Sequence, residues 1–502
     1  LAGFDFTGFS VAKVGDQAVE TVTDGPFAGL YALTQAYEII TPATSPTGMY
    51  SAVELGAKTL AVPMYQFGVF YEGDLEIHPG PPMNFTGRVH SNSRIYLNSN
   101  NVWFREVITT PDDVIHNYKH TSSPRDGTYI ENASAVDVPL TFDSRTEPDP
   151  EQFKARSAAD FDNRLQSGAY GVKPLSLPLP EGMDAHEVVR PKEVSDTELE
   201  QETKLAWLAD MYVTVDLDAV QNRMFVCGSG TEKHPGLVIE RPFGGAIPDD
   251  EDKCKIFQWS WETFVDSREL RTVDVLDVDI DELLDWIDDN LDEVSLIYIE
   301  VKPRIGAEVA PSDPSDDDYY PVVRIKNGKE LPGPLTIGTD QPLYVWGDFN
   351  TVNKQPASVA GDAYNVLSDA WDDSQHGLVL DGAARTVAAP TTVNASILAG
   401  HSATPCDINV DVACISPPYG GGFENFPRFL ETWTGVEYKF RGSIVSLWEA
   451  EVALGQWSCC SAYYSPPIRN WGFDLDLLDP ANLPPGTPHV GSVTRTSFRE
   501  AY

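Results

Sequence analysis

The side chains whose types and spacing most clearly suit ligand chemistry are four closely spaced aspartates in the segment PSDPSDDDYY: Asp313, Asp316, Asp317 and Asp318. Calcium takes six to eight oxygen ligands, and carboxylates on a flexible turn supply several of them. These residues are therefore the candidate calcium site, and calcium is the candidate cofactor that the sequence suggests. A solvated acidic loop with no bound ion is the simpler interpretation of the same residues.

The chain contains six cysteines, and none of them lies in a CxxC pair or at zinc-finger spacing. Cys406 and Cys414 flank a short polar loop and are predicted to form a local disulfide. Cys227 and Cys254 are a second plausible pair. The adjacent residues 459 and 460 are also cysteines and cannot easily pair with each other, so at least one needs a distant partner or stays free. Disulfides predict an oxidising, extracytoplasmic location.

Two short segments contain histidines at spacings that could support metal binding or acid–base chemistry. His116 and His120 would share one face of a helix, but they lie in a polar, loop-like stretch without a third ligand, so a surface pair is favoured. Arg88, His90 and Asn92 alternate, so on a strand they would project from one face. That row could bind a sugar or abstract a proton, but the solvent face of a strand is the favoured interpretation.

No established nucleophile or phosphate-binding motif occurs, since the sequence has no GxSxG elbow and no P-loop ending. Four tryptophans near the C-terminus could form a sugar-stacking platform, but core or subunit-contact positions are favoured: Trp433, Trp448, Trp457 and Trp471. No catalytic residue is assigned, and the protein is expected not to be an enzyme.

The 502 residues include 76 acidic and 35 basic side chains, giving a net charge of −41. A polyanion such as nucleic acid is a poor partner for this chain, because like charges repel. No apolar run of 18 residues occurs, so no transmembrane segment is expected. The 42% apolar content indicates a folded chain.

Short apolar segments that end at Gly or Asn recur along the chain: IYLNSN at 95–100, LYVWGDFN at 343–350 and SILAGH at 396–401. Stacked strands of a parallel β-solenoid produce such segments, because each corner must turn the chain. The predicted fold class is therefore mainly β with inserted helices (α+β), around an irregular parallel β-solenoid or β-helix-like core. A β-sandwich with long insertions would look similar.

Helices are predicted where capping residues precede an apolar pattern. Asp149 and Pro150 predict a helix to about residue 165, and Ser195 with Glu198 predicts a second that runs towards Trp207. Capping-box spacing from Asp279 predicts a third, and apolar spacing over 363–371 indicates a fourth.

The predicted organisation has four parts: an N-terminal mixed segment (1–80), a β-rich segment continuous with the C-terminal core (81–148), an inserted helix–strand region (149–320) and a C-terminal β-rich core with short helices (321–502).

Three stretches resemble a known family: GRVHSNSRIYL, TDQPLYVWGDFN and GGGFENFPRFLETWTG with the following GSIVSLW and RNWGFD. In them the chain resembles bacterial cell-surface proteins of the PilX-like, type IV pilus-associated kind, over roughly residues 63–110 and 320–495. The resemblance implies an exported structural or assembly protein with a β-solenoid-like ectodomain and no catalytic residues. The apolar pilin-type helix of that family is absent from this sequence, which argues against direct membership of a pilus fibre and leaves a cleaved or anchored surface subunit open.

The sequence thus predicts an extracellular or cell-surface structural protein, pilus- or filament-associated, that acts by self-association or by contact with other surface subunits. A polysaccharide-active β-helix enzyme, a lyase or a hydrolase, is the alternative. Such an enzyme needs paired carboxylates or a calcium-assisted base in a groove.

Overall fold

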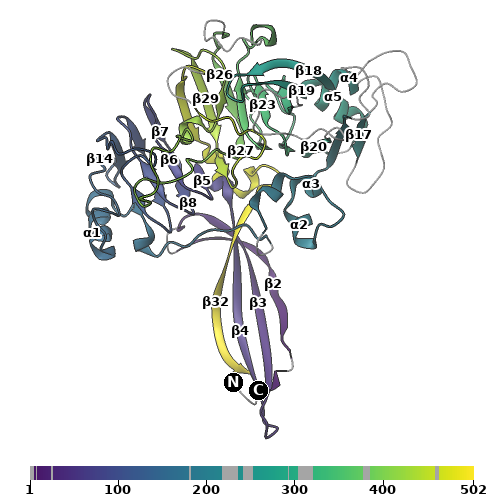
Figure 1. Ribbon diagram of the computed structural model, residues 1–502. Coiled ribbons are helices and arrows are strands. Elements are labelled where there is room, and N and C mark those ends of the chain that lie inside the picture. The colour runs from purple at the N-terminus through teal and green to yellow at the C-terminus, as the bar shows by residue number, and fades with distance from the viewer. Residues whose placement is uncertain are drawn as a thin grey trace.

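The computed structural model describes residues 5–6, 8–23, 27–179, 183–217, 236–240, 253–291, 293–302, 320–376, 385–457 and 463–501. The chain forms a broad β-rich body from which a long, narrow sheet extends, and this sheet is called the stalk (Figure 1). Both ends of the chain lie near the far end of the stalk. Among the described residues, no helix has the length and apolar character that a membrane crossing requires.

The stalk is an antiparallel sheet made from the first and last strands of the chain. Its order is β1-β3-β4-β32, and β2 pairs with β3 on the same side as β1. The strands are β1 (Asp5–Phe6), β2 (Ser10–Thr21), β3 (Tyr31–Thr44), β4 (Tyr50–Pro63) and β32 (His489–Ala501). The β3–β4 hairpin closes at a turn in which Gly48 has a φ of +80°, a conformation that favours glycine.

The largest sheet of the body joins distant parts of the chain. All neighbouring strands in it are parallel except β16 and β17. In spatial order it contains β15 (Leu165–Gln166), β11 (Ile108–Thr109), β8 (Val89–Ser91), β5 (Val69–Tyr71), β30 (Ile444–Ser446), β27 (Ser396–Ala399), β24 (Ala357–Gly361), β22 (Leu335–Thr339), β20 (Leu296–Lys302), β16 (Met211–Asp216) and β17 (Leu237–Glu240). The two halves of the body therefore meet where Val69 pairs with Ile444.

In the part of the chain that the structure describes, four smaller sheets complete the body, and most of their strand pairs are also parallel. The first contains β6 (Leu75–Ile77), β9 (Ile95–Leu97) and β12 (Val114–Ile115), and the second contains β7 (Met83–Phe85), β10 (Val102–Phe104), β13 (Thr128–Glu131) and β14 (Asp137–Pro139). The third contains β18 (Phe257–Asp266), β19 (Arg271–Asp279), β21 (Pro321–Lys326), β23 (Leu343–Trp346), β25 (Tyr364–Leu367) and β28 (Arg428–Phe429). The fourth contains β26 (Thr391–Asn394), β29 (Glu437–Gly442) and β31 (Ile468–Phe473). The predicted mainly β class, with several parallel sheets, is confirmed.

The core lies between these sheets, where equivalent positions of successive strands stack. Leu75, Ile95 and Val114 are in register, lie 20 and 19 positions apart in the sequence, and have no exposed surface. The corners bring backbones very close together. A Cβ atom on Gly127 would lie 1.9 Å from the carbonyl oxygen of Asn100, so this turn requires glycine.

Two of the predicted helices form as expected. The Asp149 carboxylate accepts hydrogen bonds from the N–H groups of Glu151 and Gln152, which begins α1 (Pro150–Phe161). Asp279 likewise accepts from Glu282 N–H at the start of α5 (Ile280–Asn290). Short side chains that bind free N–H groups are local signals, and they need no tertiary contact to act.

The other two helix predictions need correction. The capping box is formed by Thr197 and Glu200, so α2 (Glu198–Thr203) begins with a different N-cap from the predicted Ser195. The segment 363–371 contains strand β25 rather than a helix, because the flanking strands β23 and β28 offer it backbone partners. Within the described residues, the remaining helical segments are α3 (Leu205–Leu208), α4 (Lys253–Ile256) and the 3₁₀ turns Met64–Gln66, Gly168–Tyr170, Ala185–Val189, Asp373–Gln375, Phe423–Asn425, Leu475–Leu478 and Pro480–Asn482.

Candidate functional site

The stalk has one apolar face. Residues that pair across antiparallel strands project from the same side of a sheet. The large apolar residues of one side of this sheet are Val11, Val19, Leu33, Tyr37, Ile39, Val53, Leu55, Val493 and Phe498. Four of these are largely exposed: Val11 and Val19 at 53%, Phe498 at 63% and Val493 at 72%. This set is called the apolar stalk face. The same side also carries the polar residues Lys13, Gln35, Thr41, Thr59, Arg495 and Glu500.

The opposite face of the stalk is polar and internally paired. Lys58 forms an ion pair with Glu20, and Arg499 forms one with Glu54. The hydrogen bond from Arg499 lowers the pKa of the Glu54 carboxyl. Glu38 lies 3.7 Å from the same arginine. The charged groups of these pairs have partners within the sheet, so this side is the more polar of the two, and Val14, which is 51% exposed, also lies on it.

The two edges of the stalk are poorly suited to adding another strand. The pairing of β2 is interrupted by a bulge between Val14 and Ala18, and that of β32 by a bulge between Arg495 and Ser497. Bulges and charged side chains on edge strands disfavour pairing with a further strand. The apolar stalk face is therefore a more suitable contact surface than the edges.

The base of the stalk is fixed to the body by buried hydrogen bonds. The backbone N–H of Tyr31 donates to Gln66 Oε1 at 2.9 Å, and Gln66 Nε2 donates to Tyr31 O at 2.8 Å. Arg88 Nη2 donates to Ala28 O at 2.6 Å. Arg88 therefore anchors the stalk, and the stalk leaves the body at a defined position.

The Arg88–His90–Asn92 row does not form the solvent face that the sequence favoured. His90 is completely buried, with its ring nitrogens 2.8 Å from Thr109 Oγ1 and 3.0 Å from Asn92 Oδ1. Burial lowers the pKa of His90 to about 4, so the ring is neutral at physiological pH. The solvent-face prediction was wrong because the stalk connection covers this side of the body, where Phe27 contacts the His90 ring.

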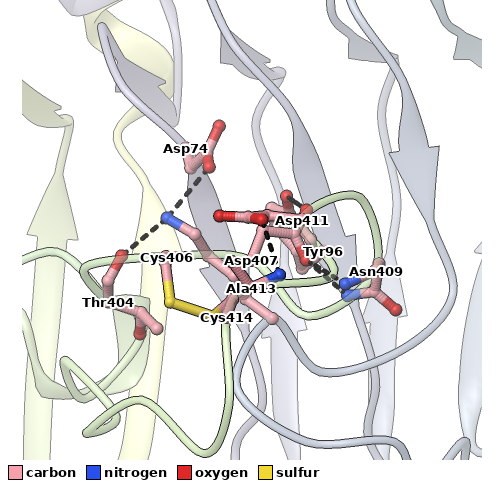
Figure 2. Close-up of a disulfide and its surroundings, with 10 residues drawn as sticks. Asp74, Tyr96, Thr404, Cys406, Asp407, Asn409, Asp411, Ala413 and Cys414 are labelled. Carbon is pink, nitrogen blue, oxygen red and sulfur yellow. Dashed lines mark hydrogen bonds and ion pairs between the residues drawn. A yellow bond between two sulfur atoms is a disulfide. The ribbon is translucent and has the colours of Figure 1, made fainter.

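The disulfide loop is a second well-defined feature. Cys406 and Cys414 form a disulfide with Cα atoms 5.9 Å apart, and the loop lies beside Asp74 and Tyr96 (Figure 2). The hydroxyl of Tyr96 donates a hydrogen bond to Asp407 Oδ2 at 2.5 Å. Lys119 Nζ donates to Thr404 O at 2.7 Å and lies 3.0 Å from an Asp74 oxygen. Both contacts fasten the loop to the body.

A buried polar cluster that the sequence did not indicate connects the end of β6 to residues 419–424. The N–H of His78 and the hydroxyl of Tyr419 donate to the two carboxylate oxygens of Glu424, each at 3.1 Å. Glu76 lies 3.5 Å from the His78 ring. Burial raises the pKa of Glu424. The hydrogen bonds to Glu424 attach the 419–424 segment next to β6. Both ring nitrogens of His78 and Glu76 Oε2 are buried without a hydrogen-bond partner among the described residues.

The two histidines considered as metal ligands do not form a helical pair. His116 Nε2 is 2.8 Å from Arg125 O, whereas the His120 ring stacks on Tyr419 at 4.5 Å between centroids. Within the described ranges, no group of three His, Cys, Asp or Glu side chains has a geometry suited to a metal ion. Trp433, Trp448 and Trp471 are buried in the core and do not form an exposed platform.

Several predicted site residues lie outside the described residues, so their predictions remain untested. These are the candidate calcium ligands Asp313, Asp316, Asp317 and Asp318, together with Cys227, the side chain of Cys254, Cys459 and Cys460. The apolar stalk face was missed for a different reason. The alternation in 31–44 and 50–63 is a strand signal, but only the pairing with 489–501 shows which side is apolar.

Comparisons with known proteins add little to this description. No known protein family matches the sequence, and no curated protein matches it. Among solved structures, the crystal structure of competence-associated pilin ComZ from Thermus thermophilus aligns over 98% of this chain and 87% of that chain, with 9% identity and a TM-score of 0.26. A TM-score this low carries no argument about a shared fold or function. The comparisons do not show the PilX-like family that the sequence resembles.

Proposed function

We propose that this chain is an extracellular structural protein of the bacterial cell surface, associated with a pilus or filament, and that it assembles through its stalk. The observation that carries the proposal is the apolar stalk face, where Val493 and Phe498 are among the most exposed large apolar residues of the described chain. A sheet with one apolar face needs a second layer to bury that face. The proposed second layer is the stalk of another copy.

The size of the face fits such a pairing. Its strands β2, β3, β4 and β32 are 12, 14, 14 and 13 residues long. With about 3.4 Å per residue and about 4.8 Å between strands, 12 residues on four strands cover roughly 800 Å². Stable interfaces bury about 800 Å² per partner. One stalk is therefore large enough for one partner stalk.

The charge of the stalk also permits self-association. Its four long strands contain four basic side chains (Lys13, Lys58, Arg495 and Arg499) and five acidic ones (Asp16, Glu20, Glu38, Glu54 and Glu500), a net charge of −1 against −41 for the whole chain. Two copies of this sheet do not repel each other appreciably, whereas two copies of the acidic body do.

A two-fold axis along the central apolar row gives a complementary arrangement. Val11, Ile39, Leu55 and Phe498 form that row, and Arg495 and Glu500 lie on opposite sides of it along β32. Rotation about the row places Arg495 opposite Glu500 of the second copy. Isologous pairing of this kind uses the same surface twice.

The body would serve as a rigid spacer in this assembly. We infer that its stacked parallel strands form an irregular β-solenoid, supported by the registers at 69–130 and 321–446. The disulfide between Cys406 and Cys414 is compatible with an oxidising extracellular location.

Analytical ultracentrifugation over a hundredfold range of concentration tests the proposal, followed by negative-stain imaging of material extracted from the producing cells. The expected result is a reversible dimer in solution and, at the cell surface, ordered assemblies in which this closed dimer is the repeating unit and a second contact links the dimers. A monomer at every concentration, with no assemblies in the native material, would overturn the proposal. A dimer that persists after the stalk is removed would show that another surface makes the contact.

A further inference from the structure

A groove opens on the body, away from the stalk, at the ends of three neighbouring strands. It has a volume of about 260 Å³ and is lined by Lys326, Asn327, Lys329, Trp346, Asp348 and Asp369. Lys326 and Trp346 end β21 and β23 and pair in register. Asp348 and Asp369 lie at equivalent positions, two residues beyond the paired residues Trp346 and Leu367. The regular stacking of strands thus brings two aspartates and a tryptophan to the lining of the same groove.

The indole of Trp346 is held rigidly. The guanidinium carbon of Arg324 lies 4.6 Å from its ring centroid. Arg324 is itself buried and bound by two carboxylates, with Nε and Nη2 donating to Asp277 at 2.7 and 2.8 Å and Nη1 donating to Asp373 at 2.6 Å. The aromatic surface that lines the groove is therefore fixed before any ligand arrives, which lowers the entropic cost of binding.

The polar groups around the indole are oriented and in part unused. Asp348 Oδ1 accepts a hydrogen bond from Thr392 N–H at 2.8 Å. Asp369 Oδ1 would lie 2.1 Å from a Cβ atom on residue 347, so the carboxylate rests against the backbone of Gly347, which has a φ of +81°. In the described part of the chain, the side chains of Lys326 and Asp369 have no hydrogen bond or ion pair.

We propose that this groove binds an uncharged polysaccharide, a function independent of the stalk. The flat apolar face of a pyranose ring packs on an indole, while carboxylates accept hydrogen bonds from neighbouring hydroxyl groups and ammonium or amide groups donate to ring and hydroxyl oxygens. A small number of convergent polar groups beside an aromatic surface is typical of a ligand site.

The charge of the site selects against acidic ligands. Two aspartates balance the two lysines of the groove, and the whole chain carries −41. A polyanion such as a uronate polymer or a nucleic acid would be repelled as it approached. An uncharged glycan loses nothing to this repulsion and can use both the donors and the acceptors of the groove.

The test is isothermal titration calorimetry of the whole protein with cellohexaose, maltohexaose and xylohexaose as neutral probes, and with a hexagalacturonate as the acidic probe. At least one neutral hexasaccharide should bind, and Trp346→Ala should weaken that binding at least about tenfold, the equivalent of about 1.4 kcal/mol. Asp369→Asn tests the carboxylate without removing the indole, and should weaken binding even if Trp346→Ala fails to fold. Trp103→Ala is the matched control, since Trp103 is a half-buried tryptophan of the body that stacks on Tyr129 outside the groove.

Each outcome decides the proposal. Loss of binding in both groove variants, with binding retained in Trp103→Ala, supports it. Failure of every neutral probe to bind, equal binding by all variants, or tighter binding of the hexagalacturonate would overturn it. Sedimentation of the same variants separates this result from the stalk, because groove substitutions should leave the dimer unchanged.

Discussion

Two valines of the same edge strand offer a direct test of the stalk interface. Val11 is 53% exposed and pairs with Ile39, whereas Val14 is 51% exposed and pairs with Ala36. They therefore project from opposite faces with nearly equal exposure. Replacing either valine by serine removes a similar apolar surface from a solvated edge strand, so the two variants should have similar stability as monomers. Only Val11→Ser should weaken the dimer.

The expected size follows from the exposed fractions. Complete burial of a valine or phenylalanine side chain contributes about 1.5–3 kcal/mol. Burying the part of Val11 that is exposed in the monomer should then contribute about 1 kcal/mol to dimerisation. An isologous interface contains this contact twice, so Val11→Ser should cost about 2 kcal/mol and raise the dissociation constant roughly 30-fold. For Phe498, which is 63% exposed, the same reasoning gives about 4 kcal/mol and roughly a 1000-fold change.

Sedimentation equilibrium of the wild type, Val11→Ser, Val14→Ser and Phe498→Ser measures these constants directly. The predicted order of weakening is Phe498→Ser first, Val11→Ser second, and Val14→Ser within about twofold of the wild type. Equal effects of the two valine substitutions would refute the assignment of the contact to the apolar stalk face. An intact dimer in Phe498→Ser would refute it as well.

Three further predictions concern the body. Burial raises the pKa of the Glu431 carboxyl from 4.5 to about 7. The stability that this group contributes is therefore fully present below pH 4.5 and is lost as the pH rises through 7. Glu431→Gln should reduce the change in unfolding free energy between pH 4.5 and 8 by about 3 kcal/mol. Replacing Cys406 and Cys414 by serine should cost about 2.5 kcal/mol, since the disulfide closes a loop with a sequence separation of 8, and should raise hydrogen exchange chiefly within that loop. Gly442→Ala should cost at least about 2 kcal/mol in denaturant unfolding, because the new Cβ would lie 2.0 Å from the carbonyl oxygen of Ala395.

Local signals in the sequence predicted local structure well. Asp149 and Asp279 bind free N–H groups only a few residues away, so the helices that follow them could be predicted from a short window. Cys406 and Cys414 are similarly close in sequence. The segment 363–371 shows the limit of this approach. Its apolar spacing fits a helix, but the chain takes the extended form because β23 and β28 supply backbone partners on both sides.

Long-range pairing could not be predicted from the sequence. Val69 pairs with Ile444, and Pro63 pairs with His489, across almost the whole length of the chain. Nothing in either segment specifies the other, because short strands of β-branched and aromatic residues are interchangeable as pairing partners. The apolar stalk face depends on the second of these pairings, because β32 contributes Val493 and Phe498 to it.

The distribution of charge favours one of the two ways in which a pair of stalks can be stacked. Outside the four long stalk strands the chain carries −40, obtained by subtracting −1 from −41. Parallel stacking would put two such bodies side by side, whereas rotation about the row of Val11 and Phe498 puts them at opposite ends of the paired stalks. Strands of 12 residues separate the bodies by roughly 40 Å, several times the Debye length of about 8 Å at physiological ionic strength. Dimerisation through the antiparallel arrangement should therefore depend only weakly on salt, and a dissociation constant that falls steeply between 50 mM and 500 mM salt would favour the parallel one.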